Sequence, residues 1–251
     1  RKRLCIPPLK VNSEVFYSDK DKAEAFARTF QISYSASQAH SSKFESIVNE
    51  SIQSLSNQSD FYFELISTDE VERSLSHLNP KKASGADNIP NCALSILSKS
   101  SIFIASLTKL LNACLKLSYF PKSWKLATML PIPNKANECN DPSSFRPISL
   151  LSCLGKCYEK IILWRLNDFE EEHQIIIQQQ FGFRSRHSTS HQIMRITENV
   201  SFGFNKNRSS GIVLLDLKHA FDSVWHDGLI HKLMQFNYPV YLIKLIQSYL
   251  N

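Results

Sequence analysis

The sequence predicts an α+β fold in which helices dominate. Apolar residues recur at helical spacing in several segments beyond residue 67, whereas only three short apolar runs have the length and the flanking residues of strands. The chain has 251 residues, of which 43% are hydrophobic, so it is long enough to bury a sizeable core. No internal repeat is evident in the sequence.

Residues 1–60 differ from the rest because they are polar and rich in serine. One helix is expected where Phe26 and Phe30 recur at helical spacing with alanines, and residues 31–57 are weakly patterned. Such a composition favours a connector that is partly helical or disordered. We therefore expect a boundary near residue 60 and one domain over residues 61–251.

The first helix of this domain should begin at Ser67, because Ser67 and Glu70 have the S-x-x-E spacing of a capping box. Asn79-Pro80 should stop it, since a proline disfavours helical backbone in the residue before it. Its buried side is predicted to consist of Val71, Leu75 and Leu78. A basic loop rich in turn formers follows over residues 81–90.

Four further helices and three strands complete the prediction. The helical faces are Ile104, Leu107, Leu111, Cys114 and Leu115; Leu154, Cys157, Tyr158, Ile161 and Ile162; Leu229, Ile230, Leu233 and Phe236; and Leu242, Ile243, Ile246, Tyr249 and Leu250. Short strands are expected over Ala127–Ile132, as a buried strand, and over Phe145–Leu151, with a polar turn between them. Ile212–Leu215 is a continuous apolar run, typical of a strand that is buried on both faces.

Charge and cysteine usage narrow the function only slightly. The net charge is +6, and from Ser67 onward 21 basic residues face 15 acidic ones, which is compatible with a polyanionic partner. Six cysteines without a C-x-x-C pair predict reduced thiols, and Cys153 and Cys157 are expected to fill the core. No apolar run is long enough to span a membrane, so we expect an intracellular chain with no membrane partner.

Asp216 is a candidate metal ligand because it directly follows the apolar run. A carboxylate at the end of a buried strand must be solvated, paired or bound to a cation, and hard oxygen ligands suit magnesium. The alternative is an aspartate that caps the following turn. Phe221, five residues on, could reach back over the same site or simply pack in the core.

Several sequence blocks give the chain a family resemblance. In order they are KKASGADNIP, PKSWKLATMLPIPNK, FRPISLLSCLGKCYEKIILWRL, QFGFRSRHSTSHQI, GIVLLDLKHAFDSVWHDGLIHKL and LIKLIQSYL. Their order and spacing over residues 67–251 resemble the fingers and early palm of the reverse transcriptase of non-LTR retrotransposons, most closely the jockey-like LINE branch. The earlier KAEAFARTF is similar to the connector between endonuclease and polymerase in such elements.

The resemblance implies a right-hand polymerase of which this chain holds the fingers and part of the palm, with palm and thumb incomplete. Asp216 matches the first catalytic aspartate, which in this family bridges two Mg²⁺ ions, and the backbone carbonyl of Leu217 helps to hold one of them. Phe221 matches the aromatic residue that selects deoxynucleotides by excluding a 2′-hydroxyl.

The resemblance also implies residues that bind the incoming nucleotide. Arg146 matches the arginine that holds the triphosphate, a role that suits its fixed fork of donors. Lys135 is the expected second cation, although a solvated surface lysine is the equal alternative.

Two further blocks are expected to contact nucleic acid. Gln180, Gly182 and Arg184 match a block that lies along the template, where Gln180 and Phe183 are as readily interpreted as packing residues. Lys81, Lys82 and Gly85 match a basic loop near the fingers tip, and solvation of the two lysines is an equal alternative to phosphate contact. In that loop Ser84 stands where proline is usual and Asn88 where glycine is usual, but asparagine also tolerates positive φ.

The 251 residues lack the paired-aspartate hairpin and the thumb that the family needs. The acidic run Glu170-Glu171-Glu172 has no flanking strands and is interpreted as a solvated helix end. The chain starts with Arg and stops inside an apolar helical pattern, so we expect both ends to be cuts in a longer polypeptide. The fragment alone is therefore expected to be inactive.

The expected parent is an RNA-directed DNA polymerase with an upstream endonuclease, found in nucleus and cytoplasm. Its partners would be an RNA template, a DNA primer or target, and dNTPs. A degenerate or repurposed copy that binds RNA without catalysis is the alternative function. A fortuitous globular interaction domain is a third hypothesis, but it needs several coincident sequence blocks.

Overall fold

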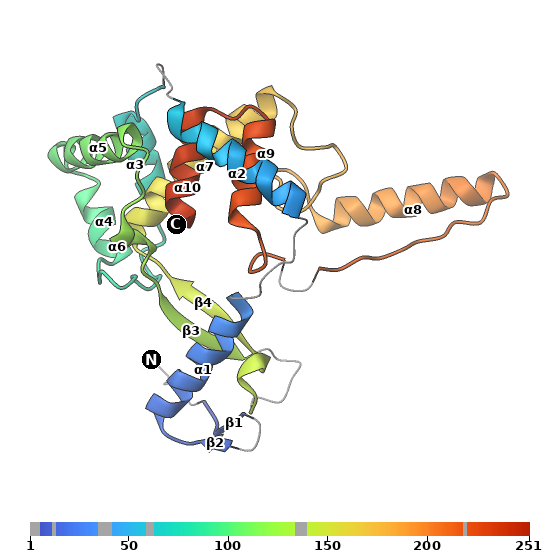
Figure 1. Cartoon of the computed structure of the whole chain (residues 1–251), viewed down its shortest axis with the longest axis horizontal. Helices are drawn as coiled ribbons and strands as arrows, with labels where there is room; N and C mark the ends of the chain where they lie inside the picture. The colour runs from blue at the N-terminus through green and yellow to red at the C-terminus, as the bar shows by residue number, and fades with distance from the viewer. Residues whose placement is uncertain (1–5, 12–13, 35–41, 59–62, 134–139, 218–219) are drawn as a thin grey trace. The chain divides into compact units, whose positions relative to one another are not determined.

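The fold is helix-rich with two small sheets, in agreement with the α+β prediction (Figure 1). The computed structural model describes residues 6–11, 14–34, 42–58, 63–133, 140–217 and 220–251. Its elements are β1 (Leu9–Val11), β2 (Glu14–Phe16), α1 (Asp19–Tyr34), α2 (Ser42–Asn57), α3 (Thr68–Ser76), α4 (Asn91–Leu97), α5 (Ser101–Lys116), α6 (Lys122–Lys125), β3 (Thr128–Pro133), the 3-10 turn η1 (Pro142–Ser144), β4 (Phe145–Leu150), α7 (Cys153–Glu172), α8 (Thr189–Asn205), α9 (His226–Gln235) and α10 (Val240–Leu250).

The chain divides into two units, one formed by residues 1–165 and 219–251 and the other by residues 166–218. Within the described ranges no single helix is long and apolar enough to cross a bilayer. Helices α4 and α5 reach the required length only together, and they meet at a bend of 113°.

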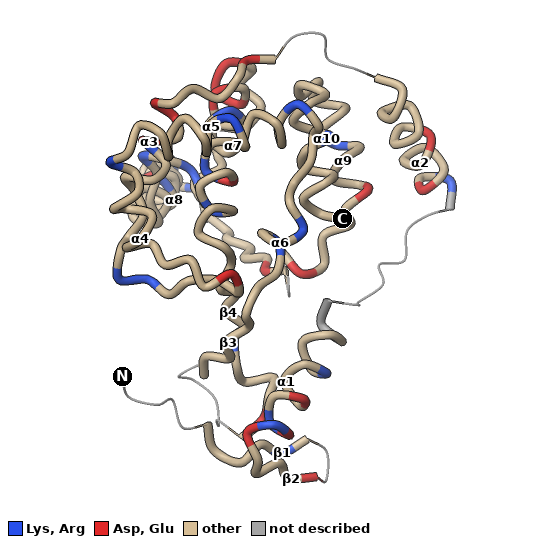
Figure 2. The backbone as a smooth tube through the Cα atoms, turned by 90° about the vertical axis from the view of Figure 1, so that its left-hand side faces the viewer, with Lys and Arg blue, Asp and Glu red and all other residues tan. Residues whose placement is uncertain are grey.

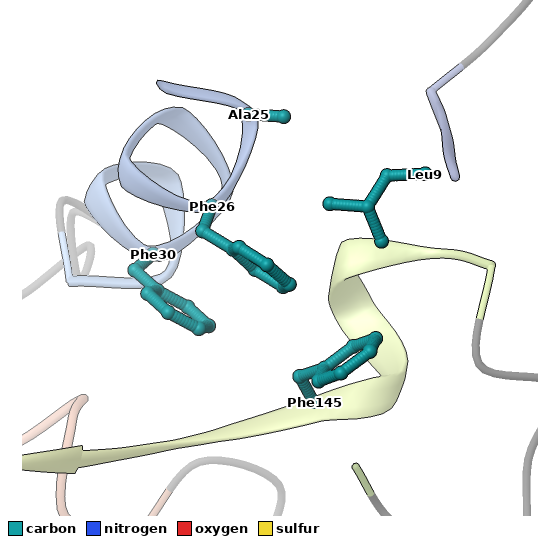
Figure 3. Packing of buried hydrophobic residues seen from close by; sticks show 5 residues of the cluster. All are labelled: Leu9, Ala25, Phe26, Phe30 and Phe145. Atoms are coloured by element: carbon teal, nitrogen blue, oxygen red, sulfur yellow. The ribbon is translucent and has the colours of Figure 1, made fainter. Parts of the chain in front are cut away.

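A small apolar cluster joins the N-terminal hairpin to β4 in the first unit. Phe26 and Phe30 of α1 stack at 5.8 Å between ring centroids, and Phe145 meets Phe26 edge-on at 4.9 Å. Leu9 and Ala25 complete the cluster (Figure 3). The predicted helix around Phe26 is thus confirmed. The weak pattern of residues 31–57 did not predict α2, which occupies much of that range.

Strands β3 and β4 form an antiparallel hairpin in which Thr128 pairs with Leu150 and Pro133 with Phe145. Both strands were predicted within one or two residues. Their burial was not, because most residues of β3 are exposed. A two-stranded ribbon has no second layer to cover both of its faces, which explains the difference.

Helices α3, α5, α7 and α10 contribute much of the buried core of the first unit. The capping box is confirmed, since Ser67 Oγ accepts from the Glu70 amide at 3.1 Å and the Glu70 carboxylate accepts from the Ser67 amide at 2.8 Å. The predicted face of α5 is buried throughout. In α7 the side chain of Tyr158 is fully buried and stacks on Phe120 at 5.5 Å.

The C-terminal helix α10 is tied to the segment between α5 and α6. Ser248 Oγ accepts from the Phe120 amide at 3.0 Å, and the Ser248 carbonyl accepts from Lys125 Nζ at 2.9 Å. A cation near the last carbonyls of a helix also favours its dipole. The buried face of α10 consists of Leu242, Ile243 and Leu245, whereas the predicted Tyr249 is 38% exposed.

Helix α2 packs against α9 through a buried histidine. The Ser51 hydroxyl donates to the Ile47 carbonyl at 2.9 Å, so Ser51 Oγ accepts from His231 Nδ1 at 2.9 Å. Gln235 Nε2 donates to His231 Nε2 at 2.9 Å, which fixes the Nδ1–H tautomer. The sequence had assigned Leu229 and Phe236 to this buried face, yet both are exposed, because a hydrogen-bonded histidine takes their place.

Candidate functional site

The segment that carries Asp216 is not a strand, which corrects the prediction for Ile212–Leu215. Residues 211–217 have no regular secondary structure, and the exposed fractions of Val213, Leu214 and Leu215 are 83%, 88% and 92%. A buried strand must pair its amides and carbonyls with a neighbouring strand, because no water reaches them. The described part of the second unit offers no such neighbour, since both sheets lie in the first unit.

Asp216 is accordingly exposed rather than held at the end of a buried strand. Among the residues that the structure describes, no group of three or more His, Cys, Asp or Glu side chains is placed to hold a metal ion. Asp216 and the carbonyl of Leu217 could supply only part of the ligand set of two Mg²⁺ ions, which need several oxygen ligands each.

Phe221 lies in the first unit, in the turn that precedes α9. Its side chain is 76% exposed, so it is not a core residue. The Val224 amide lies 3.5 Å from the Phe221 carbonyl, and α9 begins two residues later.

Arg146 is the second residue of β4 and pairs with Ile132 of β3. Its side chain is exposed, and no ion pair involves it within the described ranges. Its guanidinium is therefore available to an anion, and the hairpin fixes the position of its backbone. Lys135, the predicted second cation, lies outside the described residues.

The basic loop over residues 81–90 packs directly on the start of α7. A Cβ atom on Gly85 would lie 2.4 Å from the carbonyl carbon of Leu151 and 2.5 Å from the Ser152 amide nitrogen, so only glycine allows this close approach. Asn88 has a φ of 56°, which confirms that asparagine takes the positive φ that glycine usually supplies here. Lys81 and Lys82 are exposed, in a basic stretch before α4 (Figure 2).

Two polar residues of this loop region were not singled out from the sequence. Asp87 Oδ1 accepts from the Ile89 amide at 3.1 Å, while its Oδ2 is buried without a hydrogen-bond partner in the described structure. Asn91 Nδ2 donates to the Asn79 carbonyl at 2.8 Å and joins the two ends of the loop. For Asp87 the signal was its place in the KKASGADNIP block; Asn91 lies just beyond that block and gave no signal.

Gln180, Gly182 and Arg184 lie together in one loop of the second unit. Gln180 Nε2 donates to the Gly182 carbonyl at 3.1 Å, and Arg184 donates to the Ile177 carbonyl at 3.3 Å. Phe183 has a φ of 59° and is 97% exposed, so it does not pack a core. A bulky residue with positive φ is uncommon, and here it presents an aromatic ring to solvent.

The same loop is followed by α8, whose Arg195 lies near it. The ring of Phe181 meets His187 at 5.0 Å between centroids, and the Arg195 guanidinium of α8 lies 5.9 Å from the Phe181 centroid. Residues 173–215 contain five Lys or Arg residues and one acidic residue, Glu198. This part of the second unit is suited to a polyanion.

Burial shifts several titratable groups in α7. Cys153 and Cys157 are buried, which confirms them as core residues. This burial raises the pKa of the Cys157 thiol to about 11, and it raises the pKa of Cys153 as well. It also raises the pKa of Glu159, partly offset by a hydrogen bond with Tyr249. Glu171 and Glu172 lie exposed at the end of the helix, as predicted.

Comparison with known proteins identifies the family. The sequence pattern of the family described as reverse transcriptase (RNA-dependent DNA polymerase) matches residues 132–251. A probable RNA-directed DNA polymerase from transposon BS of Drosophila melanogaster is 39% identical over 74% of this chain and 20% of its own length. The RNA-directed DNA polymerase from mobile element jockey of Drosophila funebris is 32% identical over 92% of this chain and 25% of its own length.

A probable RNA-directed DNA polymerase from transposon X-element of Drosophila melanogaster is 35% identical over 72% of this chain. The chain spans a fifth to a quarter of the length of these relatives. Its most exposed apolar segment, residues 212–217, lies inside the matched region. The chain belongs to the reverse transcriptase family, in the group of non-LTR retrotransposon polymerases that includes jockey.

Proposed function

We propose that this chain supplies the fingers and the first part of the palm of an RNA-directed DNA polymerase of a non-LTR retrotransposon. The complete enzyme would join a dNTP to the 3′-hydroxyl of a DNA primer on an RNA template. The observation that carries the proposal is the match of residues 132–251 to the family, which includes Asp216 and Phe221.

In the complete enzyme Asp216 and the Leu217 carbonyl would supply oxygen ligands to two Mg²⁺ ions. Those ions would activate the primer hydroxyl and stabilise the leaving pyrophosphate. Arg146 and Lys135 would bind the triphosphate, and Phe221 would exclude a 2′-hydroxyl. The exposure of Asp216, Arg146 and Phe221 supports this assignment, because each must reach a ligand that is not protein.

The template would run along the loop that holds Gln180, Gly182 and Arg184, with a further contact from Lys81 and Lys82. The exposed ring of Phe183 supports this path, since a base can stack on an aromatic face. The five Lys or Arg residues against one Asp or Glu over residues 173–215 support it as well.

The isolated chain should not polymerise DNA, because it has a single candidate carboxylate for the metals. The test is a chimaera in which this chain replaces the matching segment of the jockey polymerase of Drosophila funebris. We expect magnesium-dependent primer extension on RNA by the chimaera, a loss of about 10³-fold or more in Asp216→Asn, and little change in the exposed control Asp168→Asn.

Extension by the unfused chain that Asp216→Asn abolishes would contradict the claim that it is incomplete. A folded chimaera that binds RNA but never extends a primer would instead favour a degenerate copy.

A further inference from the structure

Trp164 of α7 and two cationic side chains lie where α3 and α7 meet. The Arg73 guanidinium of α3 lies 4.5 Å from the centroid of the Trp164 ring, and Lys160 Nζ lies 5.8 Å from it. His77, which caps α3, meets the same ring edge-on at 6.5 Å between centroids. We call these four side chains the α3–α7 cation cluster.

The cluster is held in place by the helices beneath it. Arg73 and His77 are four residues apart at the end of α3, and Lys160 and Trp164 are four residues apart on α7, so each pair shares one helical face. His77 Nδ1 donates to the Arg73 carbonyl at 2.6 Å. These contacts orient the cations before any ligand binds.

An ion pair next to the cluster fixes the two helices to each other. Arg165, which follows Trp164, bridges to Glu70 at 3.3 Å, and it also donates to the Glu64 carbonyl. The side chains of Arg165 and Glu70 are only 11% and 28% exposed. Glu70 is therefore occupied and does not neutralise the cluster.

Among the described residues, the positive charge of the cluster has no carboxylate partner. Neither Arg73 nor Lys160 forms an ion pair with any residue that the structure describes, and the remaining α3 carboxylates, Asp69 and Glu72, form none either. Residues 63–165, which include α3, the basic loop and the first part of α7, contain thirteen Lys or Arg and eight Asp or Glu, a net charge of +5.

Arginine stacked on indole is a good phosphate ligand. The ring covers one face of the guanidinium, while the donors at its edge stay available for two parallel hydrogen bonds to a phosphate. Lysine adds a second point charge nearby. Two cations beside one aromatic ring are the kind of groups that bind single-stranded nucleic acids, in which charged phosphates alternate with stacking bases.

We propose that the α3–α7 cation cluster binds the backbone of a single-stranded nucleic acid. The cluster is separate from the residues assigned to the nucleotide and the template above. This site is tested by binding alone and does not depend on polymerisation. The result is therefore independent of whether the chimaera extends a primer.

The test is fluorescence anisotropy of the 251-residue chain with a labelled 20-nucleotide single strand, as RNA and as DNA of the same sequence, at several salt concentrations. For Arg73→Gln/Lys160→Gln we expect Kd to rise about tenfold at 0.1 M KCl. The slope of log K against log salt should fall by about 1.4, since each lost phosphate contact removes about 0.7 for a single strand.

The matched control is Lys99→Gln/Lys109→Gln, which removes the same charge from two exposed positions. Its Kd should change by less than about twofold. An equal loss in both double variants would show a diffuse basic surface and overturn the site. An unchanged Kd in both double variants would also overturn the proposed site.

Arg73→Lys keeps the charge but removes the planar fork, and it keeps the proposal testable if the double variant does not fold. We expect it to raise Kd by about threefold with little change in salt slope. Wild-type affinity in this variant would contradict a stacked arginine. A polyglutamate peptide of matched charge that binds as tightly, and depends on the same two cations, would overturn nucleic acid as the occupant.

Discussion

The start of α7 and the segment over residues 212–217 are both apolar, and they differ completely in burial. Cys153, Cys157, Tyr158 and Ile161 are at most 1% exposed, whereas the apolar residues of 212–217 are 59% to 92% exposed. The exposed segment is the more apolar of the two, so hydropathy alone does not predict which one is buried. What separates them is where their backbone hydrogen bonds go.

A helix satisfies its amides and carbonyls internally, so an amphipathic helix needs only an apolar surface to cover one of its faces. A strand needs a neighbour for its backbone and a layer for each buried face. Helix α7 finds its surfaces within the first unit, but the described part of the second unit has no strand to pair with residues 212–217. The same apolar character therefore gives a core in one place and an open segment in the other.

The largest contrast should appear when one side chain is truncated in each segment. Ile161→Ala, at a fully buried position, should lower the free energy of unfolding by about 2–5 kcal/mol. Leu214→Ala, at a position 88% exposed, should change it by less than about 0.5 kcal/mol. Urea unfolding followed by circular dichroism measures both, and a Leu214 effect as large as that of Ile161 would mean that residues 212–217 are packed in solution.

Two glycines extend the comparison to the backbone. Gly85→Ala places a Cβ 2.4 Å from the Leu151 carbonyl carbon, so the loop must move, at a cost of about 1–3 kcal/mol. Gly211→Ala meets nothing within 4 Å and should be almost neutral. Thermal melts of both variants measure this difference. Equal stabilities would show that the 81–90 loop does not pack closely against the start of α7.

A smaller effect should follow from the buried acid of α7. Burial raises the pKa of Glu159 in the folded chain, so its contribution is most favourable below the unfolded pKa of about 4.5 and is lost as pH rises through the folded value. Glu159→Gln removes this pH-dependent loss of stability, because glutamine does not ionise. We expect it to raise Tm by about 2–4 °C at pH 7.5, equivalent to about 1 kcal/mol, and by almost nothing near pH 4.

Glu171→Gln, at an exposed position of the same helix, should leave Tm within about 1 °C at both pH values. A Glu159→Gln variant that is less stable at pH 7.5 would mean that the ionised carboxylate is needed there.

Local signals in the sequence predicted local structure well. The capping box of α3, the buried face of α5 and the positive φ of Asn88 each depend on residues that lie within a few positions of one another. Long-range partners were not predictable in this way. The buried His231 is paired with Ser51, 180 residues earlier, and nothing in the neighbourhood of either residue indicates the other.

The candidate site shows the same difference between local features, which the sequence predicts, and long-range features, which it does not. The sequence located Arg146 on a strand, as the structure has it, and grouped Gln180, Gly182 and Arg184 in one block, which forms a single loop in the structure. It did not predict the exposure of Asp216 and Phe221, because that depends on which segments cover them in space. The roles of these residues rest on family resemblance and stay predictions.

The contact between α2 and α9 sets a time scale for synthesis of the chain. Val48 and Leu55 of α2 are almost fully buried, and the bond from His231 to Ser51 spans 180 residues. At roughly 5–20 residues per second on the ribosome, α9 emerges roughly 10–40 s after α2. During that interval the apolar side of α2 has no partner from α9, which makes it a natural surface for a chaperone on the nascent chain.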